Sequence, residues 1–367
     1  MTDWFSISGA EVLDTPALVV YPARVRHNLA QLTASIDDVR RLRPHVKTHK
    51  SPDATLLTMA AGIHKFKCAT IAEAEMLALC RAPDVLLAYQ PVGPKADRFV
   101  ELVQRYPQTQ FSCLIDQYET AHQLHQLAAA SGLTISVFLD LNVGMNRSGI
   151  APAAALALYQ QCAALPYLHM AGVHAYDGHI HEASLAERTA RCHAAFAPVE
   201  ELVAQLHTSG FQPVVVAGGT PTFPAHAARE GVECSPGTFI YWDSGYGQAF
   251  AEQSFLPAAL VLTRVVSLPT PTTLCVDLGH KSIASESALD KRVTFLNAPE
   301  LRPIGHSEEH LVLEAGPDHN FQVGDLLYGL PHHICPTVAL YNQAATVENE
   351  QLTGTWQVTA RSRTLTV

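Results

Sequence analysis

The chain has 367 residues, of which 48% are hydrophobic and 16% charged, a composition typical of a globular protein with room for two domains. Its formal net charge of −10 argues against nucleic acid as a natural partner. No signal-peptide pattern opens the sequence and no stretch approaches a membrane span, so we expect a cytoplasmic protein without a membrane partner. The 8 cysteines are scattered without a Cys-x-x-Cys pair, which favours reduced thiols over a disulfide framework.

The most basic stretch of the chain is Leu42–Ser51, with the sequence Leu-Arg-Pro-His-Val-Lys-Thr-His-Lys-Ser. Pro44 disfavours a helix at the residue before it, so we interpret the stretch as an extended strand. Alternate side chains of a strand share a face. The basic residues of one face would then be Arg43, His45, Lys47 and His49. A lysine amine crowded by other cations loses its proton readily and becomes a nucleophile, so Lys47 is the candidate Schiff-base lysine. A solvated basic face on a surface strand is the alternative.

Between Arg41 and Gly237, short apolar runs alternate with helical patterns. The predicted strands are Leu42–Lys47, Lys65–Ala69, Asp84–Ala88, Gln110–Ile115, Ile135–Asp140, His169–His174, Pro213–Ala217 and Val232–Ser235. The longest helical interval between them is Leu185–Thr208. Strands that alternate with helices eight times predict a (β/α)₈ TIM barrel in the α/β class, with an open doubly wound sheet as the alternative.

After about Ser254 the apolar runs become short and β-branched, with Pro, Gly and Asn between them, which predicts an all-β domain. The expected strands are Leu260–Val266, Thr272–Val276, His310–Glu314, Leu326–Tyr328, Thr337–Val347 and Thr355–Thr359. We expect the N-terminal run Ala17–Val20 to pair into this domain, which makes it discontinuous. The predicted limits are 21–250 for the barrel, and 1–20 with 251–367 for the β domain.

In such a barrel, active groups lie at the carboxyl ends of the strands, and an anion site is expected after strands seven and eight. Small residues stand at both positions and let backbone amides approach an oxyanion closely. They are Gly218, Gly219 and Thr220 after strand seven, and Gly237 and Thr238 after strand eight. Either loop alone is a weak signal, but their joint position predicts a phosphate site.

Two further strand ends carry reactive side chains. Strand five leads into Gly144-Met145-Asn146-Arg147, where Arg147 is placed to contact an anionic ring oxygen unless it pairs with a carboxylate instead. Strand six leads into the run His174-Ala175-Tyr176-Asp177-Gly178-His179-Ile180-His181. One phenol, one carboxylate and three imidazoles in so short a run predict an acid–base or metal role, with the acting residue left open.

A histidine and a cysteine stand two residues apart in the predicted β domain, at His333 and Cys335. On a strand this spacing places imidazole and thiolate on the same face, about 7 Å apart, where they can share a borderline-soft ion such as zinc. Two protein ligands leave positions open for water or substrate. Taken alone, such a pair is more often a chance match than a site.

Together these motifs resemble the D-threonine aldolase and D-serine dehydratase family, pyridoxal-phosphate enzymes of fold type III with an alanine-racemase-like barrel and a β domain. The family motif Arg-Pro-His-x-Lys-Thr-His-Lys begins at Arg43 and implies that Lys47 binds the cofactor, with His45 beside it. The resemblance also implies cofactor contacts from Arg147, Tyr176 and the two phosphate loops. It implies that His333 and Cys335 bind a divalent metal, zinc or manganese, and that the enzyme is a homodimer.

The resemblance implies a lyase that acts on D-3-hydroxy amino acids, and two reactions remain open. In retro-aldol cleavage, His181 or His179 removes the hydroxyl proton, and glycine and an aldehyde result. In β-elimination by a D-serine or D-3-hydroxyaspartate dehydratase, Lys47 takes the Cα proton, and a keto acid and ammonia result.

Two sequence features point to different branches of this family. The family's aldolases have His-x-Asp at the metal and its dehydratases have His-x-Cys, as this chain has. The histidine that follows Tyr176 resembles the aldolase branch, in which a histidine follows that tyrosine at slightly different spacing, and we favour the aldolase. Alanine racemases have an arginine at the position of Ser235, so racemisation is disfavoured. A pyridoxal-phosphate-binding barrel without catalytic activity is a further alternative.

Overall fold

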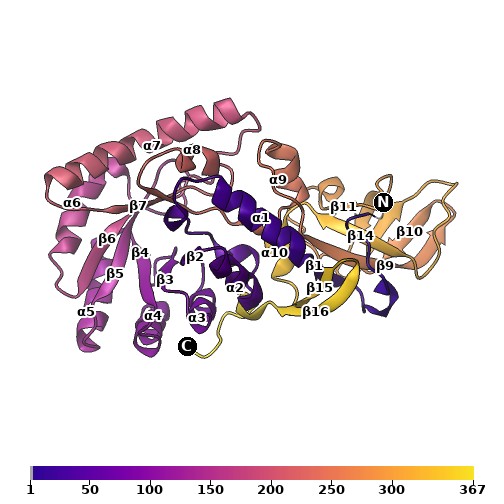
Figure 1. Ribbon diagram of the computed structural model, residues 1–367, viewed down its shortest axis with the longest axis horizontal. Coiled ribbons are helices and arrows are strands. Elements are labelled where there is room, and N and C mark those ends of the chain that lie inside the picture. Colours follow the sequence, from indigo (N-terminus) through magenta and orange to yellow (C-terminus); the bar gives the residue numbers. More distant parts are fainter. Residues whose placement is uncertain (1–2) are drawn as a thin grey trace. The chain divides into compact units, whose positions relative to one another are not determined.

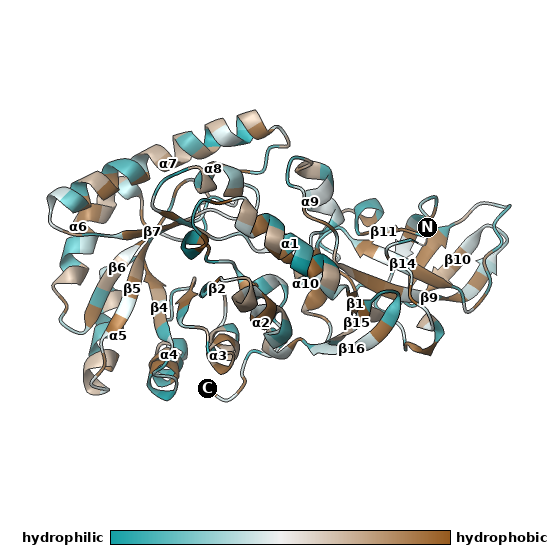
Figure 2. Cartoon of the chain, in the orientation of Figure 1, coloured by the Kyte–Doolittle hydropathy of each residue, from teal (hydrophilic) through white to brown (hydrophobic). Residues whose placement is uncertain are grey.

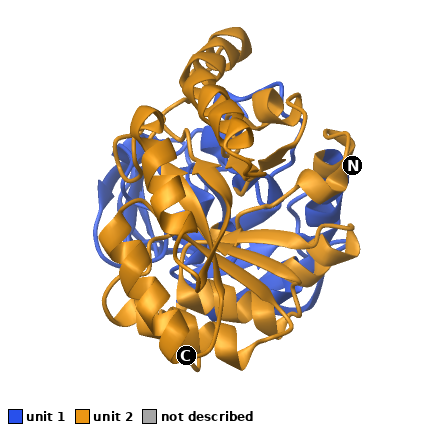
Figure 3. Ribbon diagram, turned by 90° about the vertical axis from the view of Figure 1, so that its left-hand side faces the viewer, with its two compact units in different colours: residues 1–31, 48–54, 238–361 blue, residues 32–47, 55–237, 362–367 orange. Residues whose placement is uncertain are grey.

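The computed structural model describes residues 3–367, which form two compact units (Figure 3). The first, called the β unit, comprises the residues up to Gln31, Thr48–Ala54 and Thr238–Arg361. The second, called the barrel unit, comprises Leu32–Lys47, Thr55–Gly237 and Ser362–Val367. The chain therefore passes from one unit to the other several times, and the domain limits at residues 20 and 250 stay predictions.

The barrel unit contains one parallel sheet whose strands follow chain order from β2 to β8 (Figure 1). The strands are β2 Lys65–Cys68, β3 Asp84–Leu87, β4 Gln110–Ile115, β5 Ile135–Leu141, β6 Leu168–Ala175, β7 Val214–Ala217 and β8 Val232–Cys234. Each agrees with a predicted strand to within one residue at either end. A parallel sheet with a helix after almost every strand confirms the predicted α/β barrel architecture.

The first predicted strand, Leu42–Lys47, lies between the two edges of this sheet, and we call it the seam segment. Leu42 forms an isolated parallel bridge with Cys234 of β8, and His45 forms one with Lys67 of β2. The Arg43 amide donates to the Cys234 carbonyl at 2.9 Å, and the Lys67 amide donates to the Pro44 carbonyl at 2.9 Å. The seam segment thus joins β8 to β2 without forming a regular strand.

The predicted basic face of the seam segment is wrong. A 3₁₀ helix, Val46–Thr48, turns the chain before the alternation can reach Lys47. The Arg43 guanidinium is buried and holds two carboxylates, Asp84 at 2.6 and 2.9 Å and Glu233 at 2.7 Å. Arg43 is therefore a structural ion-pair residue rather than part of a cationic surface around the lysine.

Helices pack around the parallel sheet and are encoded by local caps and apolar stripes. Those of the barrel unit are α3 Ile71–Leu79, α4 Pro94–Arg105, α5 Tyr118–Ala130, α6 Pro152–Ala163, α7 Leu185–Thr208 and α8 Phe223–Ala227. The residues of α1 Pro22–Ala34 and α2 Pro52–Ala60 are divided between the two units. At the start of α3 the Thr70 hydroxyl accepts the Glu73 amide at 3.1 Å, and at the start of α7 the Ser184 hydroxyl accepts the Glu187 amide at 3.4 Å. Figure 2 shows β7 as largely hydrophobic, whereas hydrophilic residues recur along α7. In the described part of the chain, no helix is long and apolar enough to cross a membrane.

The β unit is built on a 9-stranded sheet with the main order β12-β13-β10-β9-β1-β15-β16, and β14 pairs with β9 and β11. The strands are β1 Ala17–Val20, β9 Ala259–Thr270, β10 Thr273–Val276, β11 Val293–Phe295, β12 Arg302–His306, β13 Leu311–Glu314, β14 Leu326–Pro331, β15 Gln343–Glu348 and β16 Gln351–Gln357. Strand β1 pairs with β9 and β15, so the N-terminal run joins the C-terminal sheet as predicted. This confirms a second, discontinuous all-β domain.

Two short helices, α9 Ser244–Ala249 and α10 Ile334–Val338, interrupt the β unit. Helix α10 replaces the first part of the predicted strand Thr337–Val347. The Asp243 carboxylate accepts the Ile334 amide at 3.0 Å and so caps this helix from a distant part of the chain. Pro336 lies in its first turn, where a missing amide is tolerated. Sequence periodicity could not reveal a cap that comes from so far away.

Candidate active site

Lys47 is the last residue of the seam segment, at the face of the barrel unit where the carboxyl ends of the strands lie. Its backbone amide donates to Nδ1 of His45 at 3.2 Å, so this imidazole fixes the backbone that carries the lysine. The Lys47 ammonium lies 5.9 Å from the ring centroid of Tyr176. The structure thus brings together three residues that the family resemblance assigns to the cofactor, and their roles stay predictions.

The Tyr176 ring is surrounded by further cations. The Arg147 guanidinium carbon lies 5.0 Å from the ring centroid, and the Lys67 ammonium lies 5.4 Å from it. A Cβ at Gly178 would lie 2.4 Å from the phenol oxygen, so only glycine lets the ring occupy this position. Three positive groups around one aromatic ring provide a favourable place for an anionic ligand.

Asp140 and His174 form a buried pair at the ends of β5 and β6. The His174 Nδ1 donates to Asp140 at 2.8 Å, and the Ser148 hydroxyl donates to the same carboxylate at 2.9 Å. Burial alone would raise the pKa of Asp140, but the His174 bond and its other donors lower it. Burial lowers the pKa of His174 to about 4, and the Lys67 ammonium acts in the same direction. The carboxylate is therefore ionised beside a neutral imidazole, and His174 Nε2 is left as an acceptor.

Some buried polar atoms in the barrel unit have no hydrogen-bond partner among the described residues. His174 Nε2, near the end of β6, and Ser235 Oγ, directly after β8, are two of them. Parallel strands end at one edge of a barrel, so both atoms belong to the face where the resemblance places the cofactor. Buried polar atoms are rarely left unpaired in native proteins. The residues present therefore fit a polar ligand at this face, as pyridoxal phosphate would be.

The predicted phosphate loops are not rows of free amides. Three glycine amides already donate to acceptors of the protein itself. These bonds join Gly218 to the Ala175 carbonyl at 3.0 Å, Gly219 to the Thr222 hydroxyl at 3.3 Å and Gly237 to the Thr220 hydroxyl at 3.0 Å. These hydrogen bonds within and between the loops hold their shape.

The glycines of these loops also provide room. A Cβ at Gly218 would lie 2.6 Å from the His226 ring, and one at Gly219 would lie 3.1 Å from the Tyr176 ring. The last predicted loop residue, Thr238, belongs to the β unit, where its hydroxyl lies 3.8 Å from the Cys335 thiol.

The two histidines after Tyr176 differ in their surroundings. The His179 ring lies against the loop that carries Arg147, because a Cβ at Gly144 would be 2.8 Å from its Nε2. Its Nδ1 is buried and has no partner within the described residues, and burial lowers the pKa of this histidine. His181 is exposed, and its Nδ1 donates to the His179 carbonyl at 2.9 Å. The structure thus brings His179 to the Arg147 loop and leaves His181 at the surface.

His333 and Cys335 meet in the β unit, although not as two residues of a strand. His333 is the N-cap of α10, yet the Cys335 thiol still contacts its imidazole, and Glu286 contacts Nδ1 at 2.5 Å. Burial lowers the pKa of His333, but the contacts with Cys335 and Glu286 outweigh it and raise the pKa to about 9. The Thr48 hydroxyl lies 3.1 Å from the Cys335 thiol. An imidazole nitrogen and a thiolate sulfur are ligand types that a borderline-soft ion such as zinc prefers, so this donor set fits a divalent cation.

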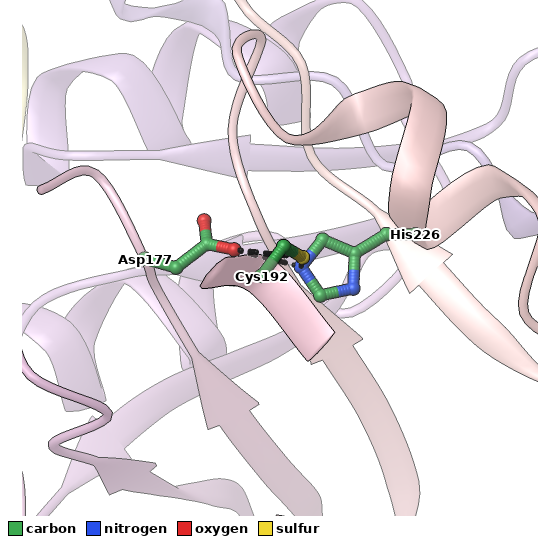
Figure 4. Close-up of side chains that lie close together, drawn as sticks. All are labelled: Asp177, Cys192 and His226. Carbon is green, nitrogen blue, oxygen red and sulfur yellow. Dashed lines mark hydrogen bonds and ion pairs between the residues drawn. The ribbon is translucent and has the colours of Figure 1, made fainter. Parts of the chain in front are cut away.

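A second group of metal-ligand types was not found from the sequence. Asp177, Cys192 and His226 have ligand atoms that all lie within 4.8 Å of one another, and all three residues are buried (Figure 4). They come from the loop after β6, from α7 and from α8, so no sequence motif could link them. His226 Nε2 donates to Asp177 at 2.8 Å, and the Cys192 sulfur lies 3.3 Å from the same nitrogen.

The protein itself supplies the partners of this cluster. The Thr222 hydroxyl donates to the second Asp177 oxygen at 2.8 Å, and the Arg229 guanidinium donates to His226 Nδ1 at 3.4 Å. Burial raises the pKa of Cys192 to about 12, which keeps its thiol protonated. A cationic guanidinium and satisfied donors disfavour a metal ion here. The cluster instead connects the loop after β6 to Thr222, which in turn holds the Gly219 amide.

Comparison with protein families identifies two regions of the chain. Residues 20–245 match the family model described as alanine racemase, N-terminal domain, which covers more than half of the chain. Residues 258–347 match the putative serine dehydratase domain.

Curated relatives match over almost the whole chain. A D-threonine aldolase of an Arthrobacter species is 29% identical over 95% of this chain and 93% of its own length. A 3-hydroxy-D-aspartate aldolase of Paracoccus denitrificans is 27% identical over 96% of this chain and 93% of its own. A D-threo-3-hydroxyaspartate dehydratase of a Delftia species is 24% identical over 94% and 97%.

Solved structures agree with these relatives. The crystal structure of a D-threonine aldolase from Filomicrobium marinum superposes with a TM-score of 0.89 at 26% identity, covering 98% of this chain and 99% of that one. A cysteine-to-alanine variant of D-threo-3-hydroxyaspartate dehydratase in the metal-free form shares the fold, with a TM-score of 0.82 at 23% identity over 95% and 98% of the chains. The chain therefore belongs to the alanine racemase N-terminal domain family and, within it, to the D-threonine aldolase and D-serine dehydratase family of fold-type III pyridoxal-phosphate lyases.

Proposed function

We propose that this protein is a pyridoxal-phosphate- and metal-dependent aldolase that cleaves D-3-hydroxy amino acids such as D-threonine to glycine and an aldehyde. The observation that carries the proposal is the position of His179. Its imidazole lies against the Arg147 loop with a buried, unpartnered Nδ1, and burial favours its neutral form. Retro-aldol cleavage needs a base for the hydroxyl proton, and a neutral imidazole with a free nitrogen is such a base. The aldolases among the relatives support this assignment.

The cofactor assignment concerns the barrel unit. Pyridoxal phosphate bound to a lysine supplies an electron sink for negative charge at Cα. Lys47 is the proposed attachment point, since His45 holds its backbone and the Tyr176 ring lies near its ammonium. Arg147 would contact the anionic ring oxygen, and Tyr176 would pack beside the ring. The proposed phosphate contacts are Gly218, Gly219, Thr220, Gly237 and Thr238.

The metal assignment concerns the β unit, where His333 and Cys335 would hold a zinc or manganese ion. Glu286 contacts Nδ1 of His333 and thus leaves Nε2 for the ion. Such an ion would polarise the substrate hydroxyl as a Lewis acid. Thr48, which contacts the Cys335 thiol, is the residue directly after Lys47 in the chain.

A dehydratase is the second candidate, and Cys335 favours it, because the resemblance assigns His-x-Cys to that branch. The dehydratase among the relatives supports this alternative. Elimination needs a base at Cα and an activated leaving group, which Lys47 and the metal could supply without His179. A barrel that only carries pyridoxal phosphate is disfavoured by the second domain and its metal pair.

Product identification separates the two lyase reactions. The full chain, supplied with pyridoxal phosphate and manganese or zinc, should convert D-threonine to glycine and acetaldehyde and leave L-threonine unchanged. His179→Ala should lower the rate on the order of 10²-fold or more, as loss of a general base does. His181→Ala is the matched control, because its exposed imidazole is expected to matter less. A keto acid and ammonia without glycine, and indifference to both substitutions, would overturn the aldolase in favour of the dehydratase.

A further inference from the structure

Lys67 has no role in the assignments above, yet it occupies the interior of the barrel unit. It is the third residue of β2, only 3% exposed, and its ammonium lies 5.4 Å from the ring centroid of Tyr176. Its backbone forms the bridge with His45, two residues before Lys47. Within the described residues, the Lys67 ammonium makes no hydrogen bond and no ion pair.

Among the described residues, two carboxylates act on this charge only at a distance, without a direct ion pair. The titratable and charged groups that act on Lys67, or on which it acts, are Lys47, Asp140, Asp177, Arg147, His174 and the neighbouring Tyr176. Both carboxylates already accept hydrogen bonds from buried imidazoles. Burial lowers the pKa of Lys67 to about 7, and the Lys47 ammonium adds to this effect. The Asp140 and Asp177 carboxylates act in the opposite direction but do not outweigh burial, so the buried ammonium remains costly.

We propose that Lys67 binds an oxyanion at the carboxyl end of the barrel, either the phenolate oxygen of the cofactor or the carboxylate of the amino-acid substrate. The proposal rests on the proposed function, because both anions belong to it. An ammonium offers three donors, and an oxyanion accepts charge-assisted hydrogen bonds from them. The bound anion would also offset the repulsion among Lys47, Lys67 and Arg147 around the Tyr176 ring.

Other unpaired groups lie on the same side of the barrel. His174 Nε2 and Ser235 Oγ are buried without partners at the ends of β6 and β8, and Lys67 is the next-to-last residue of β2. An anionic ligand at this face could accept hydrogen bonds from both the Lys67 ammonium and the Ser235 hydroxyl, and a donor group of the same ligand could reach His174 Nε2. This favours a ligand-binding role for Lys67 over an accidental buried charge.

The first test measures cofactor binding without the covalent bond. The full chain, stripped of cofactor, is titrated calorimetrically with 4-deoxypyridoxine 5′-phosphate, which keeps the phenolate but has no aldehyde to react with Lys47. If Lys67 binds the phenolate, Lys67→Met should weaken binding roughly 10-fold or more, the equivalent of one charge-assisted hydrogen bond. Lys67→Arg should stay within a few-fold of the wild type. Lys281→Met, at an exposed lysine of the β unit, is the control and should bind unchanged.

The second test measures substrate binding to the holoenzyme by its absorption change. D-alanine has the α-carboxylate, and ethylamine is the same amine without it. If Lys67 binds the substrate carboxylate, Lys67→Met should weaken D-alanine roughly 10-fold and leave ethylamine unchanged. Wild-type affinities of Lys67→Met for both the analogue and D-alanine would overturn the proposal.

A trapping control separates this failure from failure of the proposed function. Borohydride should fix the cofactor on Lys47 in the wild type and in Lys67→Met alike. If it does while all affinities are unchanged, only the role of Lys67 is refuted. If wild-type protein takes up neither the cofactor nor its analogue, the proposed function falls, and the role of Lys67 falls with it.

Discussion

Each unit of the molecule brings a cysteine, a histidine and a carboxylate together, in opposite surroundings. In the barrel unit, Asp177, Cys192 and His226 are buried and bonded to one another, to Thr222 and to Arg229. In the β unit, the His333 and Glu286 side chains are about half exposed, at 48% and 50%, and their contacts favour positive charge on the imidazole. Ligand types at short distance therefore do not by themselves make a metal site. What decides is whether the protein has already satisfied them.

Removal of the Cys335 thiol should give the largest effect. Cys335→Ala removes one of two proposed protein ligands, so turnover should fall on the order of 10²-fold or more, together with the metal content. Both are measured by steady-state kinetics and by elemental analysis of dialysed protein. Cys192→Ala is the matched control and should keep its metal. If Cys192→Ala loses the metal while Cys335→Ala retains it, the metal site is the buried cluster in the barrel unit and not the pair in the β unit.

Asp177 should matter for stability rather than for metal. Asp177→Ala leaves the buried His226 and the Thr222 hydroxyl without their acceptor, so the free energy of unfolding should fall on the order of 3 kcal/mol. Urea denaturation measures this change, and the exposed Asp318→Ala is the control. Unchanged stability with a loss of bound metal would show that the cluster holds an ion after all.

Substitution of Glu286 should have a smaller effect, on the affinity of the proposed site for its metal. Glu286→Gln keeps the size of the side chain but weakens the acceptor at His333 Nδ1, so metal affinity should fall on the order of 10-fold. Calorimetric titration with manganese or zinc measures it. Glu309→Gln, at an exposed glutamate that pairs with Lys281, is the control and should bind the ion normally. Equal affinities for both variants would mean that Glu286 does not orient the histidine.

The pH dependence of stability should show the smallest difference. Burial alone would raise the pKa of Asp177, but the bonds from His226 and Thr222 lower it below the unfolded value. Its stabilisation is therefore present above the unfolded pKa of about 4 and is lost as pH falls through the lower folded pKa. A tenfold difference in proton affinity between the folded and unfolded states corresponds to about 1.4 kcal/mol. Between pH 6 and pH 2, wild-type protein should lose more unfolding free energy than Asp177→Asn does, and parallel curves would contradict this.

Regular elements were predictable from the sequence because their periodicity is local. Strands β2 to β8 follow apolar runs of the right length, and each begins or ends within one residue of its prediction. The strand proposed over Leu42–Lys47 has the right place but not the right geometry, since a 3₁₀ helix over Val46–Thr48 ends the extended run. Helix α10 was missed because its cap, Asp243, is 91 residues away from Ile334.

Candidate site residues could be named from the sequence only where they stand in short motifs. Lys47, Arg147 and Cys335 were named from such motifs, whereas Cys192 and His226 lie 34 residues apart and become partners only through the fold. Lys67 carried one local signal, a charged residue inside the otherwise apolar run Phe66–Cys68. The sequence does not show whether Lys67 faces the interior of the barrel, because this depends on how the sheet curves. It also does not show that Lys67 has no ion-pair partner among the described residues.

The seam segment has a consequence for local opening of the barrel. Strands β4 and β5 have a regular ladder on each side, whereas Leu42–Lys47 is held by isolated bridges, by single backbone hydrogen bonds and by the ion pairs of Arg43. Segments with few backbone hydrogen bonds open at lower free energy than core strands. In hydrogen-exchange measurements, the seam amides should therefore become deuterated well before those of β4 and β5. The residue proposed to bind the cofactor would thus lie on a part of the barrel that opens more readily than its central strands.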